Sequence, residues 1–198
     1  MNISVIDELR RKLAHFTGIA WVIASFYVTL NQTILILAAF FFFALVTAAL
    51  YEYLKSIPLL GNLIRFLHSM ARSEEKSAKV YYGAIYFFGS LIVILFATQS
   101  LPVFRGAALV LIVGDSLSAI VGKAFGKHEL PHNPYKSREG SIAGFIGASI
   151  AAAFVLPIPL AVFAAFIGMA IESLPWDLND NLTIPLAVGF FLWILTTL

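Results

Sequence analysis

The 198-residue chain contains no cysteine and little charge. The absence of cysteine excludes a disulfide framework, a thiolate metal site and a cysteine nucleophile. Charged residues make up 12% of the chain and hydrophobic residues 60%, whereas an ordinary soluble domain is about a quarter charged and about half apolar. So few charges cannot cover the surface of a soluble globule. The composition therefore indicates an integral membrane protein and excludes a secreted module, a disordered chain and a DNA-binding domain.

Long apolar runs dominate the sequence. A membrane-spanning helix needs about 20 mostly apolar residues, and seven runs meet or approach this length: 13–30, 33–51, 80–97, 101–122, 141–156, 157–174 and 182–198. The fifth and sixth runs abut at Pro157 and Pro159, where proline favours a tight turn; one long broken helix is the alternative. The predicted fold is an all-α, polytopic bundle of about seven transmembrane helices that forms one membrane-embedded domain over residues 1–198.

Basic residues are concentrated on one side of these spans. Of the 13 Lys and Arg residues, only Arg105 lies near the opposite side. The positive-inside rule therefore predicts a cytoplasmic N-terminus, with the loops 52–79, 123–140 and 173–181 on the cytoplasmic face. Apolar residues at helical spacing in the loop 52–79 predict an amphipathic helix at the membrane surface. A basic helix resting on lipid headgroups is a simpler interpretation of that loop than a ligand site.

An acidic residue lies inside the fourth span. Asp115 comes eight residues before Lys123, so it lies about 12 Å deeper at 1.5 Å per residue. Ionisable residues within spans are costly and often mark functional sites. A carboxylate with a lysine nearer the cytosol suits a metal ion and a phosphate chain. The alternative is a buried ion pair without chemistry.

The loop 123–140 carries glycines and basic side chains. Lysine and arginine donate to phosphate groups, and the start of the fifth helix would present amides and the positive end of its dipole to an anion. The phosphate-binding pattern G-x-x-x-x-G-K-[ST] is absent. The predicted nucleotide-binding residues are Lys123, Lys127, Lys136, Ser137, Arg138, Gly140 and Ser141. For this loop taken alone, a basic segment that only orients the protein is the simpler interpretation.

The loop 173–181 and the residue before it carry three carboxylates and no basic residue. Together with the carboxylate in the fourth span, these groups would repel one another unless a cation lay among them. Oxygen ligands favour Mg²⁺ or Mn²⁺ over zinc. The predicted metal ligands are Asp115, Glu172 and Asp180. The alternative is an acidic loop that caps the seventh helix with Asp180 or Asn181.

His15 lies near the cytoplasmic end of the first span, on one helical face with Arg11 and Gly18. It is either a functional side chain or a histidine that extends to the interface.

Four motifs follow one another along the chain. They are Arg11-Lys12-Leu-Ala-His15-Phe-Thr-Gly18, Gly114-Asp115-Ser116 with Gly122-Lys123-x-Phe125-Gly126-Lys127, Lys136-Ser137-x-Glu139-Gly140-Ser141-x-Ala143-Gly144, and Asp180-Asn181-Leu182-Thr183-Ile184-Pro185. In this order they resemble the CTP-dependent lipid kinases, which include dolichol kinase, phytol kinase and a diacylglycerol kinase. The central loop is also similar to phosphatidate cytidylyltransferase. The first and last motifs look like the kinase branch.

The resemblance implies a catalytic domain that transfers a phosphoryl group from CTP, with Mg²⁺ or Mn²⁺, to a lipid alcohol of the polyprenol, phytol or diacylglycerol type. It adds Asn181 and Thr183 to the nucleotide-binding residues. The predicted catalytic residues are Asp115, His15 and Lys123, and either Asp115 or His15 would accept the proton of the acceptor hydroxyl. The expected partners are CTP, the lipid alcohol and the bilayer, with no nucleic acid, and a homo-oligomer is compatible with the sequence.

Two other functions remain open at this point. One is a cytidylyltransferase that forms a CDP-lipid and pyrophosphate. The other is a small transporter whose pathway includes Asp115 and Arg105, although its outer side carries few polar residues.

Overall fold

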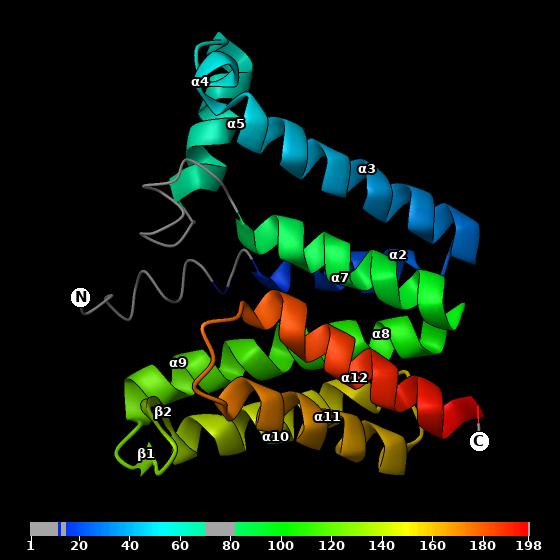
Figure 1. Cartoon of the computed structure of the whole chain (residues 1–198), viewed down its shortest axis with the longest axis vertical. Helices are drawn as coiled ribbons and strands as arrows, with labels where there is room; N and C mark the ends of the chain where they lie inside the picture. Colours follow the sequence, from blue (N-terminus) through cyan, green and yellow to red (C-terminus); the bar gives the residue numbers. More distant parts are fainter. Residues whose placement is uncertain (1–11, 13–14, 70–81, 198) are drawn as a thin grey trace.

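The protein is a helical bundle with one short hairpin (Figure 1). The computed structural model describes residues 12, 15–69 and 82–197. Their helices and strands are α2 (Ile19–Ala24), α3 (Leu30–Ala49), α4 (Tyr51–Leu54), α5 (Pro58–Ser69), α7 (Tyr82–Thr98), α8 (Leu101–Leu109), η1 (Val110–Asp115), α9 (Ser116–Phe125), β1 (Glu129–Leu130), β2 (Asn133–Ser137), α10 (Arg138–Ala152), α11 (Ile158–Ser173) and α12 (Asp180–Thr197).

Three helical segments of the described chain are long and apolar enough to cross a membrane: Leu30–Ala49, Leu101–Phe125 and Asp180–Thr197. The shorter apolar helices α7 and α11 pack against them. Large side chains such as Phe42 and Phe96 are 66% and 64% exposed, which suits a surface that faces lipid rather than water. The protein is therefore a membrane protein, and the total of seven spans stays a prediction.

The predicted first span, 13–30, is not one continuous helix in its described part. Helix α2 has six residues, with turns immediately before and after it. A Cβ atom on Gly18 would lie 2.8 Å from Ile112 Cδ1 and 3.0 Å from Phe87 Cζ. This glycine therefore brings the chain into close contact with η1 and α7, and tertiary packing overrides the helical pattern. Arg11, part of the predicted helical face, lies outside the described residues.

The chain turns between α10 and α11, as its prolines predict. Helix α10 ends at Ala152, and α11 begins directly after Pro157. The alternative of one long broken helix is wrong.

The fourth predicted span is a single helix in three parts, α8, η1 and α9, and η1 is a π-helical turn. Five of its six residues are buried, and it ends at Asp115. A π turn has a wider hydrogen-bonding pattern than an α-helix and is often found at functional sites. Helix α10 packs against α9 so closely that a Cβ atom on Gly140 would lie 2.6 Å from the Ser118 carbonyl oxygen.

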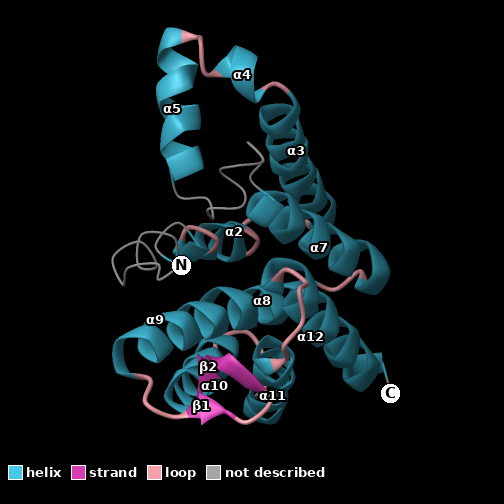
Figure 2. Cartoon of the chain, turned by 60° about the vertical axis from the view of Figure 1, so that its left-hand side comes forward, coloured by secondary structure: helices cyan, strands magenta, loops and turns pink. Residues whose placement is uncertain are grey.

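The loop 123–140 contains an antiparallel hairpin, so the fold is not purely α-helical. Glu129 pairs with Ser137 and Leu130 with Asn133. The hairpin lies beside α10 and α11 (Figure 2), and the Asn133 side-chain amide donates to the Ser173 carbonyl at 3.0 Å. We call this end of the bundle the hairpin end; the α11–α12 connection lies there too (Figure 1, left).

Two other predicted loops contain structure that bears on the expectations. The loop 52–79 holds α5, which confirms a helix there, while its residues 70–79 lie outside the described part. In the loop 173–181, Asn179 Oδ1 accepts from the Asn181 amide at 3.0 Å, and the Asn179 carbonyl accepts from the Leu182 amide at 2.9 Å. Asn179, not Asp180 or Asn181, therefore caps α12.

Candidate active site

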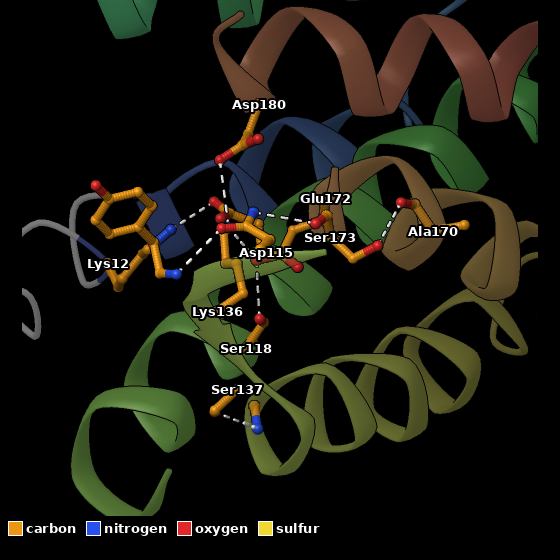
Figure 3. A network of polar contacts seen from close by, with 12 residues as sticks. Lys12, Asp115, Ser118, Lys136, Ser137, Ala170, Glu172, Ser173 and Asp180 are labelled. Atoms are coloured by element: carbon orange, nitrogen blue, oxygen red, sulfur yellow. Dashed lines mark hydrogen bonds and ion pairs between the residues drawn. The ribbon is translucent and has the colours of Figure 1, made fainter. Parts of the chain in front are cut away.

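Asp115 belongs to a network of buried charges at the hairpin end (Figure 3). It is 4% exposed, and its Oδ2 accepts a hydrogen bond from Lys12 Nζ at 2.5 Å. Lys12 is itself 1% exposed. The same carboxylate oxygen lies 3.6 Å from His15 Nδ1. The wide turn of η1 thus ends at a carboxylate that faces a cation and an imidazole.

Glu172 and Lys136 form a second ion pair in the network. The Glu172 side chain, near the end of α11, is fully buried, and its Oε1 also accepts from Ser118 Oγ at 2.9 Å. Its Oε2 is buried and has no hydrogen-bond partner among the described residues. A buried acceptor left unsatisfied is costly, so this oxygen favours the binding of a donor or a cation.

Lys136 also connects this pair to α12. Its Nζ lies 3.9 Å from Asp180 Oδ2. Burial lowers the pKa of Lys136, but the nearby charges of Asp180, Glu172 and Asp115 outweigh burial and hold the pKa above its ordinary value. Lys136 is therefore charged at neutral pH. Among the described residues, the network contains three carboxyl groups and two ammonium groups.

A polar cavity of about 420 Å³ opens beside Lys136, between α9 and the hairpin. Lys123, Lys127 and Lys136 line it, together with Ser118 and Ser137. Its volume lies within the usual range of ligand pockets. The structure therefore brings the three predicted lysines to one cavity.

The other predicted nucleotide-binding residues of this loop are placed differently. Ser137 Oγ caps α10 by accepting from the Gly140 amide at 3.1 Å, so this amide is already engaged. Arg138 is exposed at the start of α10 and does not line the polar cavity. The Ser141 hydroxyl oxygen is buried without a hydrogen-bond partner in the described chain. Of this group, only Ser137 borders the cavity.

A second cavity, of about 280 Å³, lies between α2, α3 and α7 and is largely apolar. His15 and Asn181 line it, and His15 connects it to Asp115. The Asn181 side chain donates to the Gly83 carbonyl at 2.9 Å, which ties α12 to α7. The structure thus places Asn181 on the apolar cavity, and Thr183 borders neither cavity.

The three predicted metal ligands, Asp115, Glu172 and Asp180, all belong to the network. Asp115 contacts Lys12, and Glu172 and Asp180 contact Lys136. The described residues contain no group of three or more His, Cys, Asp or Glu side chains placed to hold a metal ion. Mg²⁺ commonly uses one or two carboxylates and takes its other ligands from substrate phosphates and water. Carboxylate oxygens, with the unsatisfied Oε2 of Glu172 among them, fit an ion of that kind arriving with a nucleotide.

Glu139 holds the base of the hairpin in place. Its Oε1 lies 2.6 Å from His128 Nδ1, and its Oε2 accepts from the Lys127 and His128 amides at 3.2 and 3.3 Å. The hydrogen bond from His128, followed by backbone amides, lowers the pKa of Glu139 to about 2. Glu139 therefore stays ionised well below neutral pH and fixes the chain that carries Lys127.

Comparison with known proteins places the chain among relatives. The model of the cytidylyltransferase family matches residues 8–197. The chain belongs to this family. It is 27% identical over 215 residues to a probable chloroplastic phytol kinase of Triticum aestivum, covering 96% of this chain and 69% of that protein. It is 30% identical over 148 residues to a chloroplastic farnesol kinase of Arabidopsis thaliana, covering 64% and 48%.

A third relative is an uncharacterized protein of Methanocaldococcus jannaschii, 34% identical over 141 residues, with 69% of this chain and 67% of that protein covered. No solved structure matches the chain. The family and these relatives confirm the resemblance to the CTP-dependent lipid kinases and their cytidylyltransferase relatives.

Sequence reasoning about this family member missed Lys12 as a site residue. Lys12 lies in the basic N-terminal tail, and the positive-inside rule already explains basic residues there. A lysine of the site therefore cannot be distinguished by sequence from lysines that only orient the protein in the membrane. Two signals were present. Lys12 belongs to the first of the four motifs, and Lys12 and His15 are three residues apart, which places both on one face of a helix. The structure shows both at Asp115.

Replacing Glu139 with glutamine should raise the KM for CTP several-fold while kcat changes less. The variant keeps the shape of the side chain but removes the charge that holds His128 and the Lys127 amide. Steady-state kinetics would measure the split. Asp177→Asn, which removes a carboxylate from an exposed residue, is the matched control, and equal effects of the two variants would contradict this role.

Proposed function

We propose that the protein transfers the γ-phosphoryl group of CTP to the hydroxyl of a membrane isoprenoid alcohol, giving a lipid monophosphate and CDP. One observation carries the proposal: the Asp115 network lies between a polar cavity lined by lysines and an apolar cavity. The names of the phytol and farnesol kinase relatives support an isoprenoid acceptor.

The polar cavity would hold the triphosphate of CTP. Phosphoryl transfer depends mainly on positioning and on neutralising the charge of the phosphates. Lys123, Lys127 and Lys136 line this cavity, and Lys136 lies closest to the carboxylates. We therefore assign Lys136 to the phosphate nearest the acceptor, and Lys123 and Lys127 to the remainder of the nucleotide.

The acceptor hydroxyl would lie at His15. This histidine lines the apolar cavity and also faces Asp115. Lys12 already donates to Asp115 Oδ2, the oxygen that faces His15. This hydrogen bond makes the carboxylate a weak proton acceptor. We therefore assign the acceptor's proton to His15. Its Nδ1 lies 3.4 Å from Ser116 Oγ, which helps to orient the ring, and the nearby charge of Asp115 would stabilise the charged imidazole.

Asp115, Glu172 and Asp180 would contribute to the binding of Mg²⁺ or Mn²⁺, directly or through water, and the ion would supply charge neutralisation at the phosphates. The unsatisfied Oε2 of Glu172 supports the binding of a cation together with the nucleotide.

We also propose that the protein crosses the membrane several times with its hairpin end in the cytoplasm. The basic residues of the loop 123–140 gather at that end, where a soluble nucleotide would enter. The isoprenoid alcohol would arrive sideways from the bilayer.

A cytidylyltransferase is the second candidate because the matching family model carries that name. Purified protein in detergent should be given Mg²⁺ and either γ-labelled or α-labelled CTP, with farnesol, geranylgeraniol, phytol, diacylglycerol and phosphatidate offered separately. We expect label to reach an isoprenoid alcohol from the γ position only. Label from the α position would establish the cytidylyltransferase reaction instead, and no transfer from either would contradict both enzymatic functions.

A further inference from the structure

The apolar cavity has a polar end and an aromatic end. At the first lie His15, Gly83 and Asn181; at the second lie Trp21, Phe40 and Phe88. Gly83 and Phe88 are five residues apart on α7, which corresponds to about 7.5 Å along the helix axis. The cavity therefore extends from the charged network along α7.

The aromatic end is formed by three rings that contact one another. The Trp21 and Phe40 ring centroids are 4.1 Å apart, those of Phe40 and Phe88 are 5.6 Å apart and stacked, and those of Trp21 and Phe88 are 6.1 Å apart. Each ring comes from a different helix: α2, α3 and α7. We call this trio the aromatic floor.

We propose that the apolar cavity holds the hydrocarbon tail of the acceptor and that the aromatic floor opposes tails that extend past it, so that the protein favours shorter isoprenoid alcohols over longer ones. This inference rests on the proposed function. The hydroxyl of such an alcohol lies at His15, beside Asp115, and its tail points toward the floor. A tail that continues past the floor meets the rings of Trp21, Phe40 and Phe88, and we expect this contact to disfavour longer alcohols.

The wall of the cavity also suits a branched isoprenoid tail. The cavity wall carries the rings of Phe43 and Phe87 in addition to the floor, and small residues, Ala44 and Ala84, alternate with them. Methyl branches fill such gaps between aromatic rings, which raises apolar contact.

Phe40→Ala tests the floor. Phe40 lies at the lipid-facing surface of α3 and is 38% exposed, so its removal opens the floor without emptying the core. We expect the ratio of kcat/KM for geranylgeraniol to that for farnesol to rise by about tenfold, as is typical when a hydrophobic pocket gains room for additional carbon atoms. Phe42→Ala is the matched control, because Phe42 is on the same helix, 66% exposed and away from the cavity.

Ala84→Leu tests the same idea in the opposite direction. It narrows the cavity from α7 and should lower the ratio of kcat/KM for geranylgeraniol to that for farnesol. Unchanged ratios in both variants, with farnesol still phosphorylated, would overturn the inference and leave the proposed function intact. No phosphorylation of any alcohol by the wild-type protein would instead contradict the proposed function.

Binding can be measured apart from turnover. Trp21 is one of three tryptophans. The other two, Trp176 and Trp193, are partly exposed, and replacing both with phenylalanine leaves Trp21 as the single tryptophan. A farnesol analogue with a nitroxide at the tail end should quench Trp21 more than an analogue labelled near the hydroxyl. Unlabelled farnesol should relieve that quenching. Equal quenching by both analogues, or no relief, would contradict tail binding at the floor.

Discussion

Asp115→Asn should reduce kcat by about 1,000-fold, the scale expected for removing a preorganised charge from an active site. The amide has the size of the carboxylate but cannot neutralise Lys12, orient a protonated His15 or take part in binding a cation. Labelled CTP and farnesol would measure turnover, and thermal unfolding in detergent would measure folding.

The effect of this variant on folding can be separated from its effect on chemistry. Asp115→Asn leaves the buried ammonium of Lys12 without its carboxylate, so some destabilisation is expected. Adding Lys12→Met should restore the unfolding temperature but not activity. Asp177→Asn controls for the loss of one negative charge at an exposed position. Wild-type turnover in Asp115→Asn would remove this residue from the mechanism.

Glu172→Ala should lower the free energy of unfolding by about 3 kcal/mol and nearly eliminate activity. Breaking a buried ion pair by removing one partner costs about 3–5 kcal/mol because the remaining charge is uncompensated. The lower figure applies here because the Lys136 side chain is 26% exposed. Ser118 would lose its acceptor as well. Denaturant titration monitored by circular dichroism would measure stability.

A milder variant isolates the proposed role of Glu172 in cation binding. Glu172→Gln preserves shape and the hydrogen bond with Ser118, and with Lys136→Met it should recover most of the lost stability. Glu172→Gln alone should raise the Mg²⁺ concentration needed for half-maximal activity more than Asp177→Asn does. Lost activity with unchanged Mg²⁺ dependence would contradict this role and leave Glu172 as a structural partner of Lys136.

The charged residues of the site were largely predictable because membrane spans penalise charge strongly. Asp115 stood out for that reason, and the acidic loop pointed to Glu172 and Asp180 on the same face. The structure brings all three to Lys12 and Lys136, although their roles are still proposals. Lys12 was not predictable in the same way, since its apparent role as an orienting charge was already a sufficient explanation.

The helices were easier to predict than the irregular segments. Proline positions correctly separated α10 from α11, because proline acts locally on the backbone. The first span and the hairpin depend on contacts between distant residues: Gly18 with Ile112, and Asn133 with Ser173. The apolar cavity was missed entirely, because its wall is built from side chains of three separate helices, none of which differs by itself from a lipid-facing surface.

The π-helical turn of η1 makes the site sensitive to the number of residues that precede Asp115. Each residue advances an α-helix by about 100° around its axis, so a deletion or insertion within Val110–Asp115 would rotate the carboxylate away from Lys12. Exchanges of one apolar side chain for another leave this angular position unchanged. We therefore expect the segment to tolerate an exchange of apolar side chains better than a change in its length.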